Sequence, residues 1–159
     1  MDRLDLFVIF YVENFAFMNT VLSVIVRKGG LPVTVLPDTT VMEALEIMAE
    51  KNIGSVLVMQ NDNYLGIMTE RDYSRKVILK DKHSTTTKVS EIMSTDLPSV
   101  KPTDSIDHCM QLMTEKNIRY MPVFDNNKLM GIISMSDVVK ETILAQRETI
   151  NQLQNYINS

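Results

Sequence analysis

The chain has 159 residues, with 16 lysines and arginines against 20 aspartates and glutamates, and its formal net charge at pH 7 is -4. Such a chain has no overall basic field that would hold nucleic acid or an anionic membrane, so we expect neither as a partner. The single cysteine, Cys109, excludes an intramolecular disulfide and is typical of a reducing compartment, so we expect a cytoplasmic protein.

Residues 1–18 are expected to be an N-terminal extension. The stretch from Leu6 to Val26 is long and apolar enough to cross a bilayer, but Glu13, Asn14 and Asn19 lie within it and would be costly there. We therefore expect no membrane span. The acidic start of the chain also does not fit a secretory signal.

The main body of the chain is a duplication. Residues 35–72 align with residues 100–137 without a gap, and both copies contain the run Glu-Lys-Asn-Ile, a Gly-Ile pair and a final aspartate. Each copy is too small to bury a core alone, so we expect the two to pack about a pseudo-twofold axis with a ligand in the cleft between them. The expected parts are a first repeat at 19–80, a linker at 81–88, a second repeat at 89–140 and a C-terminal helical extension at 141–159.

Each copy has the same order of predicted elements. A short extended piece reaches Val35 or Val100 and precedes a helix whose apolar residues recur at i, i+3, i+4 and i+7. A β-hairpin follows, and a second helix then begins at Glu70 in one copy and at Met135 in the other. The order β-α-β-β-α predicts an α+β fold. The predicted hairpin strands are 55–59 with 64–68, and 120–124 with 129–133.

The last helix is expected to continue to about Ile157, with Ile143, Ile150 and Ile157 at sevenfold spacing and Leu153 between them. Two interpretations fit this pattern. The apolar face either lies against the body of the protein or forms a short coiled seam with a second subunit. Two heptads do not decide between them.

Both second helices begin in a Thr/Ser-x-x-Asp turn, Thr69 to Asp72 and Ser134 to Asp137. One interpretation is helix capping, in which the hydroxyl and the carboxylate satisfy backbone N–H groups. The other is an anion and ribose site, because a helix N-terminus offers free N–H groups and a carboxylate can accept from both hydroxyls of a ribose. Capping alone does not explain the basic residues near the turns, which are Arg71, Arg75 and Arg119.

The repeated β-α-β-β-α unit with its paired turns resembles tandem CBS domains, a pair of which is called a Bateman module. The run from Glu70 to Lys76, Glu-Arg-Asp-Tyr-Ser-Arg-Lys, resembles the small stand-alone members of that family. The resemblance implies a non-catalytic regulatory module that binds adenosine-containing ligands such as AMP, ATP, NAD(H) or S-adenosylmethionine, with no required cofactor. It also implies a homodimer that passes its state to a client enzyme or transporter.

By the family pattern, Asp72 and Asp137 would hold ribose hydroxyls, and Thr69 and Ser134 would contact ribose or phosphate. The remaining residues that the resemblance places in the ligand sites are Thr34, Ile53, Ser55, Val56, Arg71, Arg75, Arg119, Tyr120, Met121 and Pro122. The two copies are not identical, since Ser136 stands in the second copy where the first has an arginine. Equal occupancy of the two sites is therefore not assumed.

Other classes of function have less support. A structural protein-interaction adaptor with vestigial pockets is the alternative to a sensor. A nucleotide hydrolase is the weakest interpretation, because no nucleophile elbow is present and no general base stands out. The two histidines, His83 and His108, are too few for a closed zinc site, so we expect no metal.

Overall fold

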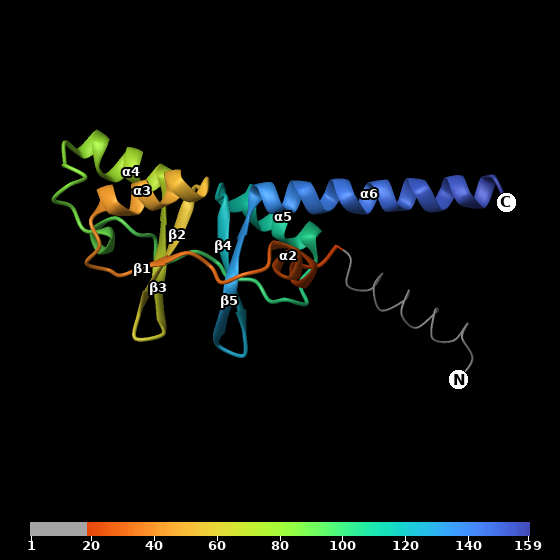
Figure 1. The fold of residues 1–159 in the computed structure, drawn as a ribbon, viewed down its shortest axis with the longest axis horizontal. Helices are drawn as coiled ribbons and strands as arrows, with labels where there is room; N and C mark the ends of the chain where they lie inside the picture. Colours follow the sequence, from red (N-terminus) through yellow and green to blue (C-terminus); the bar gives the residue numbers. More distant parts are fainter. Residues whose placement is uncertain (1–18) are drawn as a thin grey trace. The chain divides into compact units, whose positions relative to one another are not determined.

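The computed structural model describes residues 19–159, and the predicted extension at 1–18 lies outside the described residues (Figure 1). The described residues form two compact units. The first unit is Gly30–Leu97, and the second combines residues 19–29 with residues 98–159. Each unit contains helices and a β-hairpin, and the predicted α+β class is confirmed.

The first unit is built on a three-stranded sheet. Its strands are β1 (Thr34–Val35), β2 (Ser55–Gln60) and β3 (Asn63–Thr69). Their order is β1-β2-β3, with β1 parallel to β2 and β2 antiparallel to β3. Its helices are α3 (Val41–Lys51), α4 (Glu70–Lys76) and the short 3-10 helices η1 (Ile78–Lys80) and η2 (Val89–Glu91).

Local sequence signals set the ends of these elements. Helix α3 begins with a capping box, in which Thr40 Oγ1 accepts from the Glu43 N–H at 3.2 Å and Glu43 Oε2 accepts from the Thr40 N–H at 2.9 Å. The helix ends at Asn52, whose φ of 52° is the left-handed conformation common after a helix. Asn61 and Asp62 both have positive φ, as a type I′ hairpin turn requires.

Gly66 allows a close backbone approach. A Cβ atom at this position would lie 2.7 Å from the carbonyl oxygen of Ser94, which is shorter than side-chain contacts permit. The neighbouring Ile67 exchanges two backbone hydrogen bonds with Ser94, at 3.0 and 2.8 Å. The segment that follows η2 is thereby fixed against β3, near the first turn of α4.

The second unit repeats the pattern. Its elements are α2 (Val21–Lys28), α5 (Ile106–Lys116), β4 (Tyr120–Asp125), β5 (Lys128–Ser134) and α6 (Met135–Ile157). Strands β4 and β5 form an antiparallel hairpin. Val100 forms a single parallel bridge with Val123 of β4, in the place that β1 takes in the first unit. The predicted β-α-β-β-α order therefore holds in both repeats.

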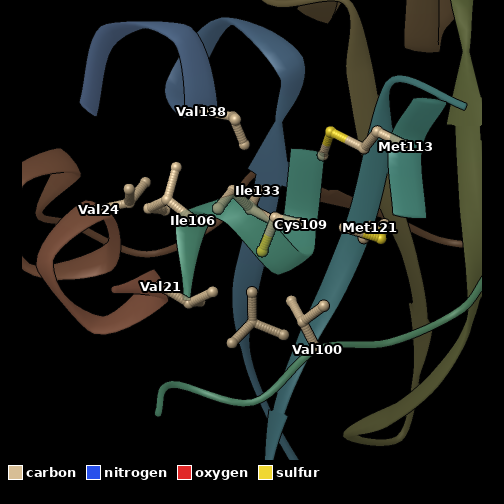
Figure 2. Packing of buried hydrophobic residues seen from close by; sticks show 10 residues of the cluster. Val21, Val24, Val100, Ile106, Cys109, Met113, Met121, Ile133 and Val138 are labelled. Atoms are coloured by element: carbon tan, nitrogen blue, oxygen red, sulfur yellow. The ribbon is translucent and has the colours of Figure 1, made fainter. Parts of the chain in front are cut away.

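Helix α2 packs in the core of the second unit (Figure 2). Val21 and Val24 of this helix are fully buried with residues of α5, β4, β5 and α6. The backbone N–H of Val21 donates to the carbonyl of Asp104 at 3.0 Å. The ranges 19–80 and 89–140 describe the duplication in the sequence. In the folded units, α2 packs with the second repeat and residues 89–97 pack with the first.

Helix α6 ends at Ile157, as predicted, but its apolar stripe is not buried. Ile143, Ile150, Leu153 and Ile157 are 43%, 53%, 57% and 77% exposed. Within residues 19–159, the stripe is therefore not covered by the body of the protein, and the C-terminal half of α6 extends beyond α2 and α5 (Figure 1). Among these residues, no helix is both long enough and apolar enough to span a membrane.

Cys109 is expected to be inert in the folded protein. Its side chain is fully buried, and burial, together with the charge of Asp104, raises the pKa of the thiol to about 11. At pH 8 only about one thiol in a thousand would be ionised, and only the thiolate reacts. A thiol reagent should label the native protein far more slowly than the protein in urea, where the usual pKa and full access return. Rapid labelling of the native protein would contradict this packing.

Candidate ligand-binding sites

The first site lies at the start of α4, and we call it the Asp72 site. Asp72 is 8% exposed, and its Oδ2 accepts from the backbone N–H and from the hydroxyl of Thr69, both at 2.9 Å. Its Oδ1 accepts from the Ser94 hydroxyl at 3.1 Å and lies 2.8 Å from Lys76 Nζ. Both oxygens of this carboxylate are thus engaged by the protein.

Several predicted residues gather around this turn. Ser55 is the register partner of Thr69 across β2 and β3, and it is 7% exposed. The backbone N–H of Glu70 donates to the Gly54 carbonyl at 3.2 Å, which brings the segment 53–55 beside the helix start. Thr34 lies exposed on the neighbouring strand, opposite Leu57.

The second site, the Asp137 site, lies at the start of α6. Asp137 Oδ2 accepts from the Ser134 N–H at 2.8 Å, and Ser134 Oγ accepts from the Asp137 N–H at 3.1 Å. Oδ2 also accepts from Lys28 Nζ of α2 at 2.9 Å. Tyr120 is the register partner of Ser134, and the Met135 N–H donates to the Arg119 carbonyl at 2.8 Å.

The two carboxylates differ in how much hydrogen-bonding capacity is left. Within residues 19–159, the hydrogen bonds to the Asp137 side chain reach Oδ2, and none reaches Oδ1. The Asp137 side chain is 16% exposed, and that of Asp72 is 9% exposed. One ribose hydroxyl could thus bind Asp137 Oδ1 without displacing a protein group, and the second would compete with Lys28 at Oδ2. At Asp72 even the first hydroxyl would compete with Ser94 and Lys76.

The profile of the family described as CBS domain matches residues 31–78 and 89–143. The chain belongs to the CBS domain family. The predicted resemblance to a small stand-alone CBS protein is confirmed. An Arabidopsis thaliana relative, CBS domain-containing protein CBSX3, mitochondrial, is 33% identical over an alignment of 156 positions that covers 92% of this chain and 76% of the relative.

Solved structures share the fold. A CBS-domain protein from Burkholderia ambifaria has a TM-score of 0.75 and 44% identity, over 79% of this chain and 94% of that one. The CBS domain pair of protein MJ0100, in a crystal structure with 5′-methylthioadenosine and S-adenosylmethionine, has a TM-score of 0.67 over 77% of this chain and 94% of that one. At 23% identity, this second likeness shows the fold alone.

Two of the predicted pocket residues are core residues. Val56 and Met121 are 1% and 0% exposed, and each belongs to the buried apolar cluster of its own unit. Pro122 is buried as well, next to Met121 in β4. Val56 and Met121 can offer a ligand mainly their backbone, because strand side chains alternate and the neighbouring Ser55 and Tyr120 point to the other face, which Pro122 shares with Tyr120.

The predicted basic residues have different settings. Arg71 and Arg75 lie one turn apart on α4, so they share a face of that helix; Arg71 is half-buried and Arg75 is exposed. Arg119 is exposed and directly precedes β4. Arg71 and Arg119 thus stand beside the starts of α4 and α6 in their respective CBS units, whereas Arg75 lies in the last turn of α4.

The sequence did not reveal three polar residues that touch the site carboxylates. These are Lys28 at Asp137, and Lys76 and Ser94 at Asp72. The position of Lys76, four residues after Asp72, was a usable signal, because such pairs meet on a helix. Lys28 and Ser94 had no local signal, since they reach the sites through tertiary packing.

Proposed function

We propose that this CBS pair is a non-catalytic regulatory module that binds an adenosine-containing ligand, namely AMP, ATP, NAD(H) or S-adenosylmethionine, at its Thr/Ser-x-x-Asp turns. The observation that carries the proposal is the carboxylate of Asp137, which is held at a helix N-terminus with one oxygen open. Such an oxygen accepts strongly from a sugar hydroxyl, and the helix dipole favours a nearby phosphate. The adenosyl ligands of the MJ0100 pair support the same ligand class.

The Asp137 site is the stronger of the two in this proposal. Its Oδ1 is open within the described residues, whereas at Asp72 the contacts of Ser94 and Lys76 with Oδ1 would have to rearrange around a ribose. Arg71, Arg75 and Arg119 would meet phosphate groups, which makes affinity for a nucleotide fall as salt rises. Adenosine, which lacks phosphate, should bind with little dependence on these arginines.

The affinity should be modest. AMP has about 23 heavy atoms, and at about 0.3 kcal/mol per atom the binding free energy is about 7 kcal/mol, which corresponds to a dissociation constant near 10 μM. At a hundredfold excess over that constant, the ligand would stabilise the folded state by about 2.7 kcal/mol. A melting scan with AMP, ATP, NAD and S-adenosylmethionine tests the proposal, and mass spectrometry of gently purified protein would identify a retained ligand.

The competing function is a structural adaptor that recruits a client enzyme or transporter through its helices and has vestigial pockets. An adaptor would show no melting shift with any of the four ligands and no retained nucleotide. A shift with at least one ligand, lost when the site carboxylates are changed, is expected only of the sensor.

We propose further that α6 pairs with α6 of a second copy to form a homodimer. Its exposed stripe of Ile143, Ile150, Leu153 and Ile157 has the spacing of a coiled-coil seam. A groove lined by Asn19, by Asp107 of α5 and by residues of α6, including Ile150, adjoins the stripe. The only charged residues between Thr142 and Ile157 are Arg147 and Glu148, so two such helices would approach without strong repulsion.

Ile150→Lys is expected to shift the protein from dimer to monomer in light scattering coupled to size exclusion, because a lysine at the centre of the seam would be buried without a partner charge. Asn155→Lys is the matched control, since it adds the same charge on the opposite side of α6. A monomeric wild type, or equal dissociation by both variants, would contradict the seam.

A further inference from the structure

Lys28 is the last residue of α2, and its ammonium group lies against the Asp137 site. Its Nζ donates to Asp137 Oδ2 at 2.9 Å and to the carbonyl oxygen of Ile132 at 3.0 Å. The side chain is 39% exposed, so water can replace the protein partners when the ammonium leaves. Lys28 therefore occupies the carboxylate that the proposed function assigns to ribose.

Lys28 is also the last residue of α2 before the chain leaves the second unit. It is followed by Gly29 and Gly30, where the chain passes from one compact unit to the other. Both glycines have positive φ, 58° and 69°, and a Cβ atom at either would meet nothing within 4 Å. This crossing, Gly29–Gly30, is therefore not held by side-chain packing, and glycine can adopt many backbone conformations.

The adjacent ion pair has a different role. Arg27 pairs with Glu141, which is 3% exposed and does not touch Asp137. This pair keeps α2 attached to α6 when Lys28 is released. Release of Lys28 would therefore free the end of α2 and the glycines after it, while the body of the helix stays in the core.

We infer that Lys28 is a counter-ion that competes with the ligand for Asp137, and that its displacement on ribose binding loosens the crossing at Gly29 and Gly30. This inference rests on the proposed function and describes a way in which ligand binding is signalled. Binding at Asp137 would increase the mobility of the segment that joins the two units. Lys76 pairs with Asp72 inside α4 and also donates to the Ile92 carbonyl at 2.7 Å, so its contacts stay within the first unit and do not reach the second crossing between Leu97 and Pro98.

Adenosine is the suitable probe, because it has the ribose but no phosphate that would attract a lysine. NMR titration that follows the Ser134 and Asp137 amides reports on this site alone. Lys28→Met should bind adenosine about 2- to 5-fold more tightly than the wild type, as expected for loss of one partly exposed ion pair. Lys28→Arg keeps the charge and should bind as the wild type does, and Lys140→Met controls for removal of a surface charge.

Two further readouts separate competition from a structural role. In the wild type, adenosine affinity should rise with salt, because screening weakens the Lys28 pair, and this rise should be absent in Lys28→Met. Amide exchange at residues 28–30 should increase when adenosine binds the wild type and should already be high in Lys28→Met.

Unchanged or weaker adenosine binding by Lys28→Met, with clear binding by the wild type, would overturn the inference and leave the proposed function intact. If neither protein binds adenosine at millimolar concentration, the proposed function at this site fails, and the inference fails with it.

Discussion

Replacing Asp137 by asparagine is expected to weaken the binding of an adenosine-containing ligand about 10- to 150-fold, while the melting temperature of the free protein changes little. The loss corresponds to charge-assisted hydrogen bonds worth about 1.5 to 3 kcal/mol. Asparagine retains a carbonyl oxygen that can accept from the Ser134 N–H, so the helix cap survives in large part. The lost pair with Lys28 is partly exposed and contributes little stability.

The measurement is isothermal calorimetry on the wild type and the variant, together with melting curves without ligand. Asp125→Asn is a suitable control, because it removes one carboxylate charge from an exposed position at the end of β4 in the same unit. Parental affinity in Asp137→Asn would leave only the capping role for this residue. The sensor hypothesis would then lose its central group.

Asp72→Asn should behave differently, although the two turns have the same sequence pattern. An asparagine amide cannot replace both oxygens of a carboxylate that accepts from Thr69 and Ser94 and pairs with Lys76. Its NH₂ group would face donors, so we expect a loss of about 1 to 2 kcal/mol in stability as well as any loss in affinity. The sequence pattern alone predicts the same behaviour for both aspartates. Their tertiary contacts differ, so the effects of the two substitutions on stability are expected to differ.

Most of the local structure could be predicted from the sequence. The starts of α4 and α6, the two hairpins and the end of α6 follow from short-range signals: caps, asparagine turns and apolar periodicity. The repeated Asn52 and Asn117 each end a helix in the left-handed conformation, which explains why that residue occurs in both copies. Such signals act within a few residues, so they can be read without knowledge of tertiary contacts.

The packing of α2 with the second repeat, and of residues 89–97 with the first, could not be predicted in the same way. Val21 and Val24 of α2 are apolar at helical spacing, but periodicity does not say which core they enter. The same limit applies to the sites. The Thr/Ser-x-x-Asp turns were visible in the sequence, whereas the contacts of Lys28 and Ser94, which decide how open each carboxylate is, come from distant segments.

Arg27→Met is expected to destabilise the second unit by about 2 to 3 kcal/mol. Glu141 is 3% exposed, and it accepts from Ser23 Oγ at 2.7 Å, from the Asn19 N–H at 3.2 Å and from Arg27. Without Arg27, a buried carboxylate would keep only two neutral donors, and an uncompensated buried charge typically costs about 3 to 5 kcal/mol. The two remaining donors and the partial exposure of Arg27 reduce the expected loss.

Amide exchange of Val21 and Val24 would report this loss, because both lie in the core of that unit and are protected only while it is folded. Arg147→Met, on the exposed part of α6, is the control for loss of an arginine. Adding Glu141→Gln to Arg27→Met should restore more than half of the lost stability, because glutamine is neutral and its oxygen can still accept from Ser23 and Asn19. If the double variant is no more stable than Arg27→Met, the cost comes from lost packing of the arginine stem, and the ion pair does not hold α2 to α6.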